Sequence, residues 1–254
     1  MYRRACALMA LGVAPLIAAD LAPTGTLRGT FLGANPVQGK VDPQSGAISG
    51  PVADLVKELA RQLKVPYTIL PAANAGVVID NLKTNKADIG FLAYDPERAA
   101  EVDFSRPYAL MHNSYVVRAD SKFQKSGDVD KPGARVGAVK GQSQQLYLSG
   151  NLKQAQVRIF PTQPPQADLE KLLLDGDIDA FGANRQRMVE AAKLSPKLRV
   201  LPDDFLVVGQ AIVVTKENHA LLDALNQFID GVRASGLVKT SLEQAGIAGV
   251  DVAP

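Results

Sequence analysis

The most informative segment of the chain runs Ala87-Asp88-Ile89-Gly90-Phe91-Leu92-Ala93-Tyr94-Asp95-Pro96-Glu97-Arg98-Ala99-Ala100-Glu101-Val102-Asp103-Phe104-Ser105-Arg106-Pro107-Tyr108. Residues 88–92 form an apolar run that is typical of the buried end of a strand. Arg98 follows in polar sequence, and its guanidinium fork matches a carboxylate with two parallel hydrogen bonds. Taken alone, Arg98 is better explained as a surface residue paired with Glu97 or Glu101.

Short apolar runs alternate with amphipathic helices on both sides of this segment, and this alternation predicts an α/β fold. Pro51 after Gly50 is a typical helix opener. We expect strands over 27–32, 67–70, 88–92, 115–117, 135–139, 157–160, 180–181 and 206–214. We expect helices over 51–63, 77–82, 167–174 and 221–232, and two more helices, one that begins at Ser143 and one near Arg185. Pro and Gly are scattered between these elements, which indicates two compact lobes joined by crossing strands rather than a flexible linker.

The first residues have the three-part pattern of a secretory signal peptide. Arg3 and Arg4 precede an uncharged, mostly apolar run over 5–19, which is too short for a membrane-spanning helix. Removal of 1–19 would leave 26 basic and 26 acidic residues and no cysteine, because Cys6 is the only one. We therefore expect an exported, soluble protein of the bacterial periplasm that depends on its hydrophobic cores for stability.

Composition excludes several classes of function. The 254 residues are 46% hydrophobic and 21% charged, with a net charge of +2 and no basic stripe, so a nucleic-acid partner is not expected. Two histidines and one cysteine make a zinc site improbable, and no glycine-rich cofactor motif is present. We expect no metal, no cofactor and no catalytic residues. His219 begins a surface helix, whereas His112 lies near the expected hinge and is explained by either a ligand-facing or a hinge role.

Segment 87–108 resembles the signature of the bacterial extracellular solute-binding proteins of family 3, the amino-acid-type periplasmic receptors of ABC transporters. Its middle part matches loosely, because Pro96 and Glu97 stand directly before Arg98. Further matches are found, in the same order and spacing, at 51–63, 141–143, 176–180 and 222–236. The resemblance covers essentially the whole chain after the signal segment.

The resemblance implies an α/β, two-lobe, type II periplasmic-binding-protein fold. Each lobe would hold a mixed sheet flanked by helices, and two hinge strands would join the lobes. Lobe one would comprise 20–111 and 208–254, and lobe two 112–207. Ligand would bind in the cleft and the lobes would close by a hinge motion. The implied partners are a small carboxylate-bearing ligand and an inner-membrane ABC permease, with the protein itself a monomer.

The resemblance also implies ligand-binding residues. Arg98 occupies the position that pairs with the ligand's α-carboxylate. Ser143 occupies a second carboxylate position at the start of a lobe-two helix, where backbone N–H groups attract an anion, and Gln142 beside it is an extra donor. The simpler role for Ser143 is to cap its helix. Asn35 is expected either to contact the ligand or to form a turn before Pro36.

Two departures from the family pattern concern the ligand's ammonium group. The position of the family's ammonium-binding Asp holds Asn184, and the Ser or Thr positions before the signature Arg hold Gly90, Phe91 and Ala93. Tyr94 follows and is expected either to stack on the ligand or to lie in the core. Because an ammonium buried without a carboxylate is costly, we expect a ligand that keeps a carboxylate but lacks a free α-ammonium.

The sequence therefore predicts a transport receptor for an organic acid, an aromatic acid or an amide-like compound, and not an enzyme. A cyclohexadienyl dehydratase acting on prephenate or arogenate, on the same fold, is the alternative. It would need a general acid, and none of the matched cleft positions supplies one. A third possibility is a protein that presents its ligand to a membrane sensor.

Overall fold

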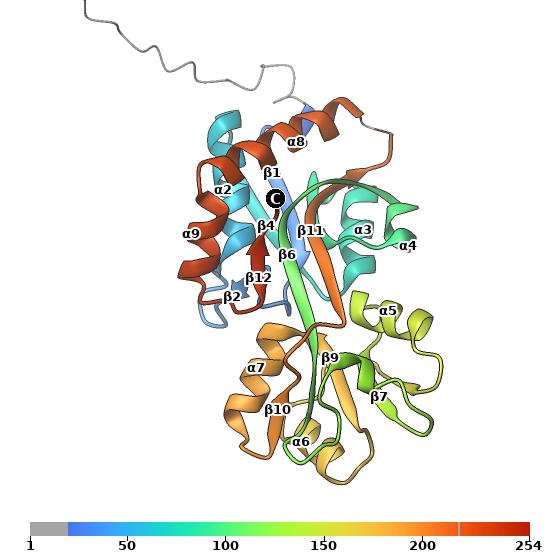
Figure 1. The fold of residues 1–254 in the computed structure, drawn as a ribbon. Helices are drawn as coiled ribbons and strands as arrows, with labels where there is room; N and C mark the ends of the chain where they lie inside the picture. The colour runs from blue at the N-terminus through green and yellow to red at the C-terminus, as the bar shows by residue number, and fades with distance from the viewer. Residues whose placement is uncertain (1–19, 218) are drawn as a thin grey trace, which may run out of the picture.

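The computed structural model describes residues 20–217 and 219–254, and the predicted signal segment 1–19 lies outside them. Within these ranges the chain forms two α/β lobes, one above the other in Figure 1. Lobe one contains β1 (Leu27–Leu32), β2 (Lys40–Val41), β3 (Ile48–Ser49), α2 (Pro51–Leu63), β4 (Tyr67–Ala72), α3 (Ala75–Lys83), β5 (Ile89–Ala93), α4 (Pro96–Ala99), β11 (Leu206–Thr215), α8 (His219–Ala234), α9 (Leu237–Gln244) and β12 (Val250–Val252).

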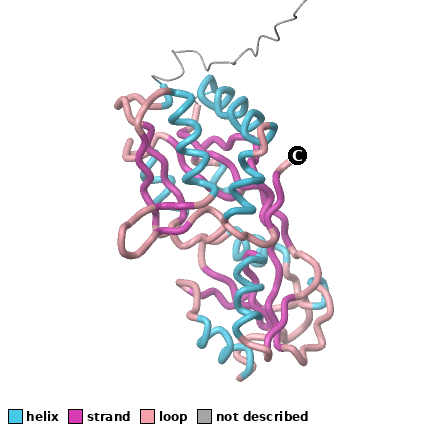
Figure 2. The backbone as a smooth tube through the Cα atoms, turned by 90° about the vertical axis from the view of Figure 1, so that its left-hand side faces the viewer, coloured by secondary structure: helices cyan, strands magenta, loops and turns pink. Residues whose placement is uncertain are grey.

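Lobe two contains the 3-10 turn η1 (Ser126–Asp128), β7 (Arg135–Val139), α5 (Ser143–Asn151), β8 (Gln156–Phe160), α6 (Gln166–Leu174), β9 (Ala180–Asn184), α7 (Arg185–Leu194) and β10 (Leu198–Val200). β6 (Val102–Arg118) is shared by both lobes. Figure 2 shows both lobes from the side, with strands running through the narrow region between them. No helix of the described residues has the length and apolarity that a membrane crossing requires.

The sheets of the two lobes are continuous through β6, which is 17 residues long. The strand order is β4-β1-β5-β11-β6-β9-β7-β8, with β10 and β12 also paired to β6. β1 pairs in parallel with β4 and β5, and β7 pairs in parallel with β8 and β9. β6 pairs antiparallel with β11 in lobe one and with β9 in lobe two. The strand predicted over 115–117 is thus the end of a much longer one.

Helix α2 has the predicted bounds, and local chemistry explains them. Pro51 occupies the first turn, and Lys64 ends the helix in the left-handed conformation with φ 58°. The apolar face that the spacing predicted is buried against β1. A side chain at Gly29 of β1 would lie 2.9 Å from the Val56 side chain, so glycine lets the helix approach the sheet closely.

Lobe one has a core on each face of its sheet. Helices α2, α8 and α9 cover one face and α3 covers the other (Figure 1). Helix α9 was not predicted, because Gly236 after α8 is typical of a helix end. In the structure Gly236 turns the chain with φ 79°, and the α9 residue Ser241 donates a hydrogen bond to Asp54 of α2. This turn brings Val238 and Leu242 into the core.

Candidate functional site

A pocket of about 310 Å³ lies between the lobes, at the ends of their parallel strands. Its polar side chains come from loops of lobe one and from strand and helix ends of lobe two. They are Asn35, Asn74, Lys140, Gln142, Thr162, Gln163, Gln144, Asn184 and Arg187. None of the described residues that line this pocket, which we call the cleft pocket, carries a carboxylate. Its charged side chains are two cations, Lys140 and Arg187.

Asn184 lines the cleft pocket at the junction of β9 and α7. Its backbone pairs with Asn113 of β6, and its side chain is 8% exposed. The Oδ1 atom accepts the backbone N–H of Arg187 at 2.9 Å and so caps α7. Because Oδ1 already accepts this hydrogen bond, the amide N–H groups of Asn184 are the donors that remain for a ligand. Such donors suit an anion rather than an ammonium.

Arg187, which sequence reasoning missed, also lines the cleft pocket. It lies three residues after Asn184, on the first turn of α7, and this spacing is the signal that could have found it. Its Nη2 donates to the carbonyl of Ala34 in lobe one at 3.0 Å. Burial lowers the pKa of Arg187, against the opposing effect of Glu190. Arg187 takes part in none of the ion pairs found among the described residues.

Arg98 reaches across the same interface from lobe one, but it lines neither the cleft pocket nor the other pocket between the lobes. It is 6% exposed, and its guanidinium donates to the carbonyls of Ala93 at 3.0 Å and of Gly141 in lobe two at 2.8 Å. Burial lowers the pKa of Arg98, while nearby Asp95 and Glu97 raise it. The alternative of a surface Arg98 paired with Glu97 or Glu101 is wrong, because the side chain is buried and Glu101 binds Lys83.

The start of α5 lies beside this contact. Gln142, the residue before the helix, makes no side-chain capping hydrogen bond and lines the cleft pocket. Ser143 is the first helical residue, so the alternative that it caps α5 is wrong. The first-turn N–H groups of α5 therefore have no side-chain cap. Gly141, which accepts from Arg98, lies between Lys140 and Gln142 in the sequence, and both of these line the cleft pocket.

Three other predicted residues lie on β5, and all three are buried in lobe one. Phe91 is fully buried and packs edge-on against Tyr108, with ring centroids 6.1 Å apart. A side chain at Gly90 would lie 2.9 Å from both Val213 and Val78, so the neighbouring core side chains leave no room for one. Ala93 is buried and its carbonyl accepts from Arg98. Ligand contact by these three residues stays a prediction.

Asn35 and Tyr94 both belong to lobe one, but they line different pockets. Asn35 lines the cleft pocket, and its Oδ1 accepts the N–H of Val37, so it is also a turn residue. Tyr94 is 51% exposed and contacts Phe104 edge-on. With Ser143, Tyr94 lines a second pocket of about 500 Å³ between the lobes. The structure thus brings Asn35, Gln142 and Asn184 together and places Tyr94 and Ser143 in the second pocket.

A family model for "Bacterial extracellular solute-binding proteins, family 3" matches residues 32–245. The chain belongs to this family. As a member it is a solute-binding protein of the amino-acid ABC transporter type.

Among its relatives, this solute-binding protein is 28% identical to "ABC transporter arginine-binding protein 1" of Escherichia coli (strain K12), over 75% of this chain and 79% of that protein. It is 20% identical to the cyclohexadienyl dehydratase of Pseudomonas aeruginosa, over 79% of this chain and 75% of that protein.

The solved structures confirm the predicted type II fold. A mutant of the arginine-binding protein ArgBP from T. maritima superposes with a TM-score of 0.71 at 25% identity, over 91% of this chain and 99% of that one. An ancestral amino acid-binding protein, described as a precursor of cyclohexadienyl dehydratase, superposes with a TM-score of 0.72 at 26% identity, over 89% and 98% of the two chains.

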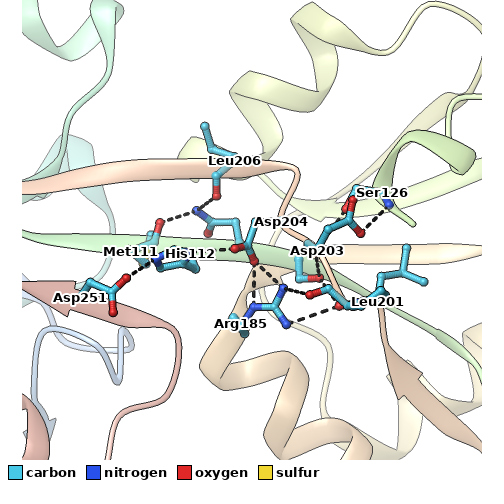
Figure 3. Close-up of polar contacts among 12 residues, drawn as sticks. Met111, His112, Ser126, Arg185, Leu201, Asp203, Asp204, Leu206 and Asp251 are labelled. Atoms are coloured by element: carbon cyan, nitrogen blue, oxygen red, sulfur yellow. Dashed lines mark hydrogen bonds and ion pairs between the residues drawn. The ribbon is translucent and has the colours of Figure 1, made fainter. Parts of the chain in front are cut away.

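In this solute-binding protein His112 lies on β6 where the strand passes between the lobes (Figure 3), and it is not among the lining residues of the cleft pocket. Its Nδ1 is 2.7 Å from Asp204, and its Nε2 is 2.9 Å from Asp251 of β12. Arg185, the first residue of α7, donates its Nε and Nη2 to the same Asp204. We call these four residues the hinge cluster. It joins both lobes through ion pairs, whereas the exact lobe limits at 111/112 and 207/208 stay predictions.

Proposed function

We propose that this solute-binding protein captures a small carboxylate that lacks a free α-ammonium and delivers it to an inner-membrane ABC permease. The supporting observation is the charge of the cleft pocket, whose described lining has two cations and no carboxylate. A buried ammonium would find no anionic partner there, and this would be costly. The proposal includes export through segment 1–19 to the periplasm and action as a monomer.

Relatives and structural neighbours carry names that refer to other ligands, among them arginine, cystine and lysine. A cationic amino acid would bring a second positive charge toward Lys140 and Arg187. Like charges in a partly desolvated cleft repel. We therefore propose a ligand of opposite charge for this chain.

The carboxylate itself would bind Arg98 and the uncapped start of α5. In the structure Arg98 donates a hydrogen bond to the Gly141 carbonyl. A carboxylate offers two acceptor oxygens with the geometry of the guanidinium fork, so it would replace a single neutral acceptor with a charge-assisted pair. The first-turn N–H groups of α5, together with the helix dipole, would add further donors.

Thermal unfolding of the chain from residue 20 tests this proposal. The protein is first unfolded and refolded to remove any ligand that purified with it. It is then heated with amine-free carboxylic acids and with L-amino acids. A ligand at a hundred times its dissociation constant adds about 2.7 kcal/mol of stability. A shift with an amine-free acid that is lost in Arg98→Ala supports the proposal. A shift with L-amino acids alone contradicts it.

The alternative function is that of a cyclohexadienyl dehydratase, the activity for which the relative from Pseudomonas aeruginosa is named. Such an enzyme must protonate the departing hydroxyl, and this requires a general acid within hydrogen-bond reach. No described lining residue of the cleft pocket is an Asp or Glu, whereas Asp95 and Glu97 line the second pocket, beside the signature Arg98. Incubation with prephenate decides between the two functions: we expect no aromatic product, and product formation would establish the enzyme.

A further inference from the structure

Two arginines reach across the cleft in opposite directions. Arg98 of lobe one donates to Gly141 of lobe two, and Arg187 of lobe two donates to Ala34 of lobe one. Both acceptors are neutral backbone carbonyls. A guanidinium has five N–H donors, and the described contacts of the Arg187 side chain use one of its two Nη atoms. Both side chains therefore keep donors for another acceptor.

The other arginines of the described residues are satisfied differently. Eight of them, at 28, 61, 106, 118, 135, 158, 185 and 233, lie within 4.0 Å of a carboxylate. Arg199 has no carboxylate partner, but it donates to three carbonyls, those of Ala119, Ser121 and Phe123. Arg98 and Arg187 thus differ from the rest in donating to a carbonyl of the opposite lobe and, among the described residues, to no carboxylate.

A partly buried cation without an anion is costly. Burial lowers the pKa of both Arg98 and Arg187, which is the electrostatic sign of this cost. A ligand with a single carboxylate, bound to Arg98, would leave the positive charge of Arg187 without an anionic partner. Lys140, exposed at the end of β7, lines the same pocket and adds a second cation on the Arg187 side.

We infer that the ligand is a dicarboxylate or a similar small dianion, whose second acidic group binds Arg187 with the help of Lys140. This inference rests on the proposed function, which assigns the first carboxylate to Arg98. The cleft pocket of about 310 Å³ is at the small end for ligand sites, and Arg98 borders it only through its acceptor Gly141, which lies between the lining residues Lys140 and Gln142. A short dianion held by one arginine from each lobe would bridge the lobes and hold them together.

Isothermal titration calorimetry with pairs of acids of equal chain length tests the inference. The pairs are succinate with butanoate, glutarate with pentanoate and adipate with hexanoate, added to the refolded chain near neutral pH, where the carboxyl groups are ionised. We expect at least one dicarboxylate to bind about tenfold tighter than its monocarboxylate partner or better.

The variants locate the second acidic group. Arg187→Gln should abolish the advantage of the dicarboxylate and weaken monocarboxylate binding much less, and Arg187→Lys should restore part of the advantage. Arg158→Gln removes the same charge from the surface of lobe two and should change neither affinity. A retained advantage in a folded Arg187→Gln protein overturns the inference.

The outcomes separate this inference from the proposed function. Monocarboxylates that bind as tightly as dicarboxylates overturn the inference and leave the proposed function standing. Binding of L-amino acids alone overturns both. Absence of binding by every dicarboxylate of the series up to about 1 mM also overturns the inference.

Discussion

Two groups of charged side chains connect the lobes, the hinge cluster and the cleft arginines. In the hinge cluster, Arg185 and His112 face the carboxylates of Asp204 and Asp251 (Figure 3). Between the lobes, the side chains of Arg98 and Arg187 donate hydrogen bonds only to carbonyls, and the carboxylates of Asp95, Glu97 and Glu190 act on them from beyond direct contact. The hinge cations are therefore in direct contact with carboxylates, whereas the cleft arginines are not. This difference supports the proposal that the first group serves structure and that the second binds an anionic ligand.

The largest effect is expected for Arg98→Gln, which removes the proposed carboxylate partner. Removing one member of a buried, hydrogen-bonded charge pair costs roughly 2–5 kcal/mol of binding free energy. Calorimetric titration with the tightest-binding acid of the panel measures the loss, and circular dichroism checks the fold. Affinity kept at the wild-type level would place the carboxylate elsewhere.

Asn184→Asp puts into the cleft pocket the acidic residue that its described lining lacks. Asp is as good a helix cap as Asn, so we expect the melting temperature to stay nearly unchanged. The added negative charge should weaken binding of an anionic acid by roughly 1–3 kcal/mol, an estimate based on one charge-assisted hydrogen bond. The same titration measures the change. Unaltered affinity would show that the ligand does not approach Asn184.

A stability comparison separates the hinge cluster from the cleft. Arg185→Gln removes a fork of two hydrogen bonds to Asp204, and we expect a loss of roughly 1–2 kcal/mol in the free energy of unfolding after allowance for solvent screening. Arg187→Gln removes an unpaired charge and should change that free energy by less than about 0.5 kcal/mol. Urea unfolding without ligand measures both. Equal losses of unfolding free energy in the two variants would contradict the proposed difference between the hinge cluster and the cleft arginines.

The smallest effect is expected from pH at His112. Burial lowers the pKa of His112, but hydrogen bonds and attraction from Asp204 and Asp251 raise it more, so its folded pKa lies above the usual value. Its contribution to stability is then complete below the unfolded pKa of about 6.5 and is lost as pH rises through the folded pKa. Urea unfolding across this range should show His112→Gln approaching the wild type as pH rises. A difference in unfolding free energy between the two proteins that grows as pH rises would contradict a raised pKa of His112.

Apolar spacing and turn residues predicted most of the fold. The bounds of β1, α2 and β7 agree with the structure because each has a clear apolar pattern or a defined start such as Pro51. The length of β6 was not predicted, since Pro107 and the polar residues 112–114 interrupt its pattern. In the structure the register of the β6–β11 pairing shifts between Gln210 and Ala211, beside Pro107, so the strand continues past a residue that lacks an N–H.

The candidate site could be predicted only in part. The positions of Asn184 and Gln142 relative to the family motifs predicted a place in the cleft for both residues, and both line the cleft pocket. Arg187 was missed because its role depends on the first turn of α7 facing lobe one, which is a tertiary property. All five residues of β5 are buried, so no alternation in the sequence indicates which side chains face the cleft. That the Phe91 ring packs on Tyr108 is therefore visible only in the structure.

The most direct test of the central claim is one calorimetric comparison on the refolded chain from residue 20, with glutarate and with L-arginine as ligands. The claim is that the cleft pocket binds an anion without an ammonium group. It predicts saturable binding of glutarate and no measurable binding of L-arginine. Tight binding of L-arginine, with none of glutarate, would contradict it and would mean that the cations of the cleft do not determine what the protein binds.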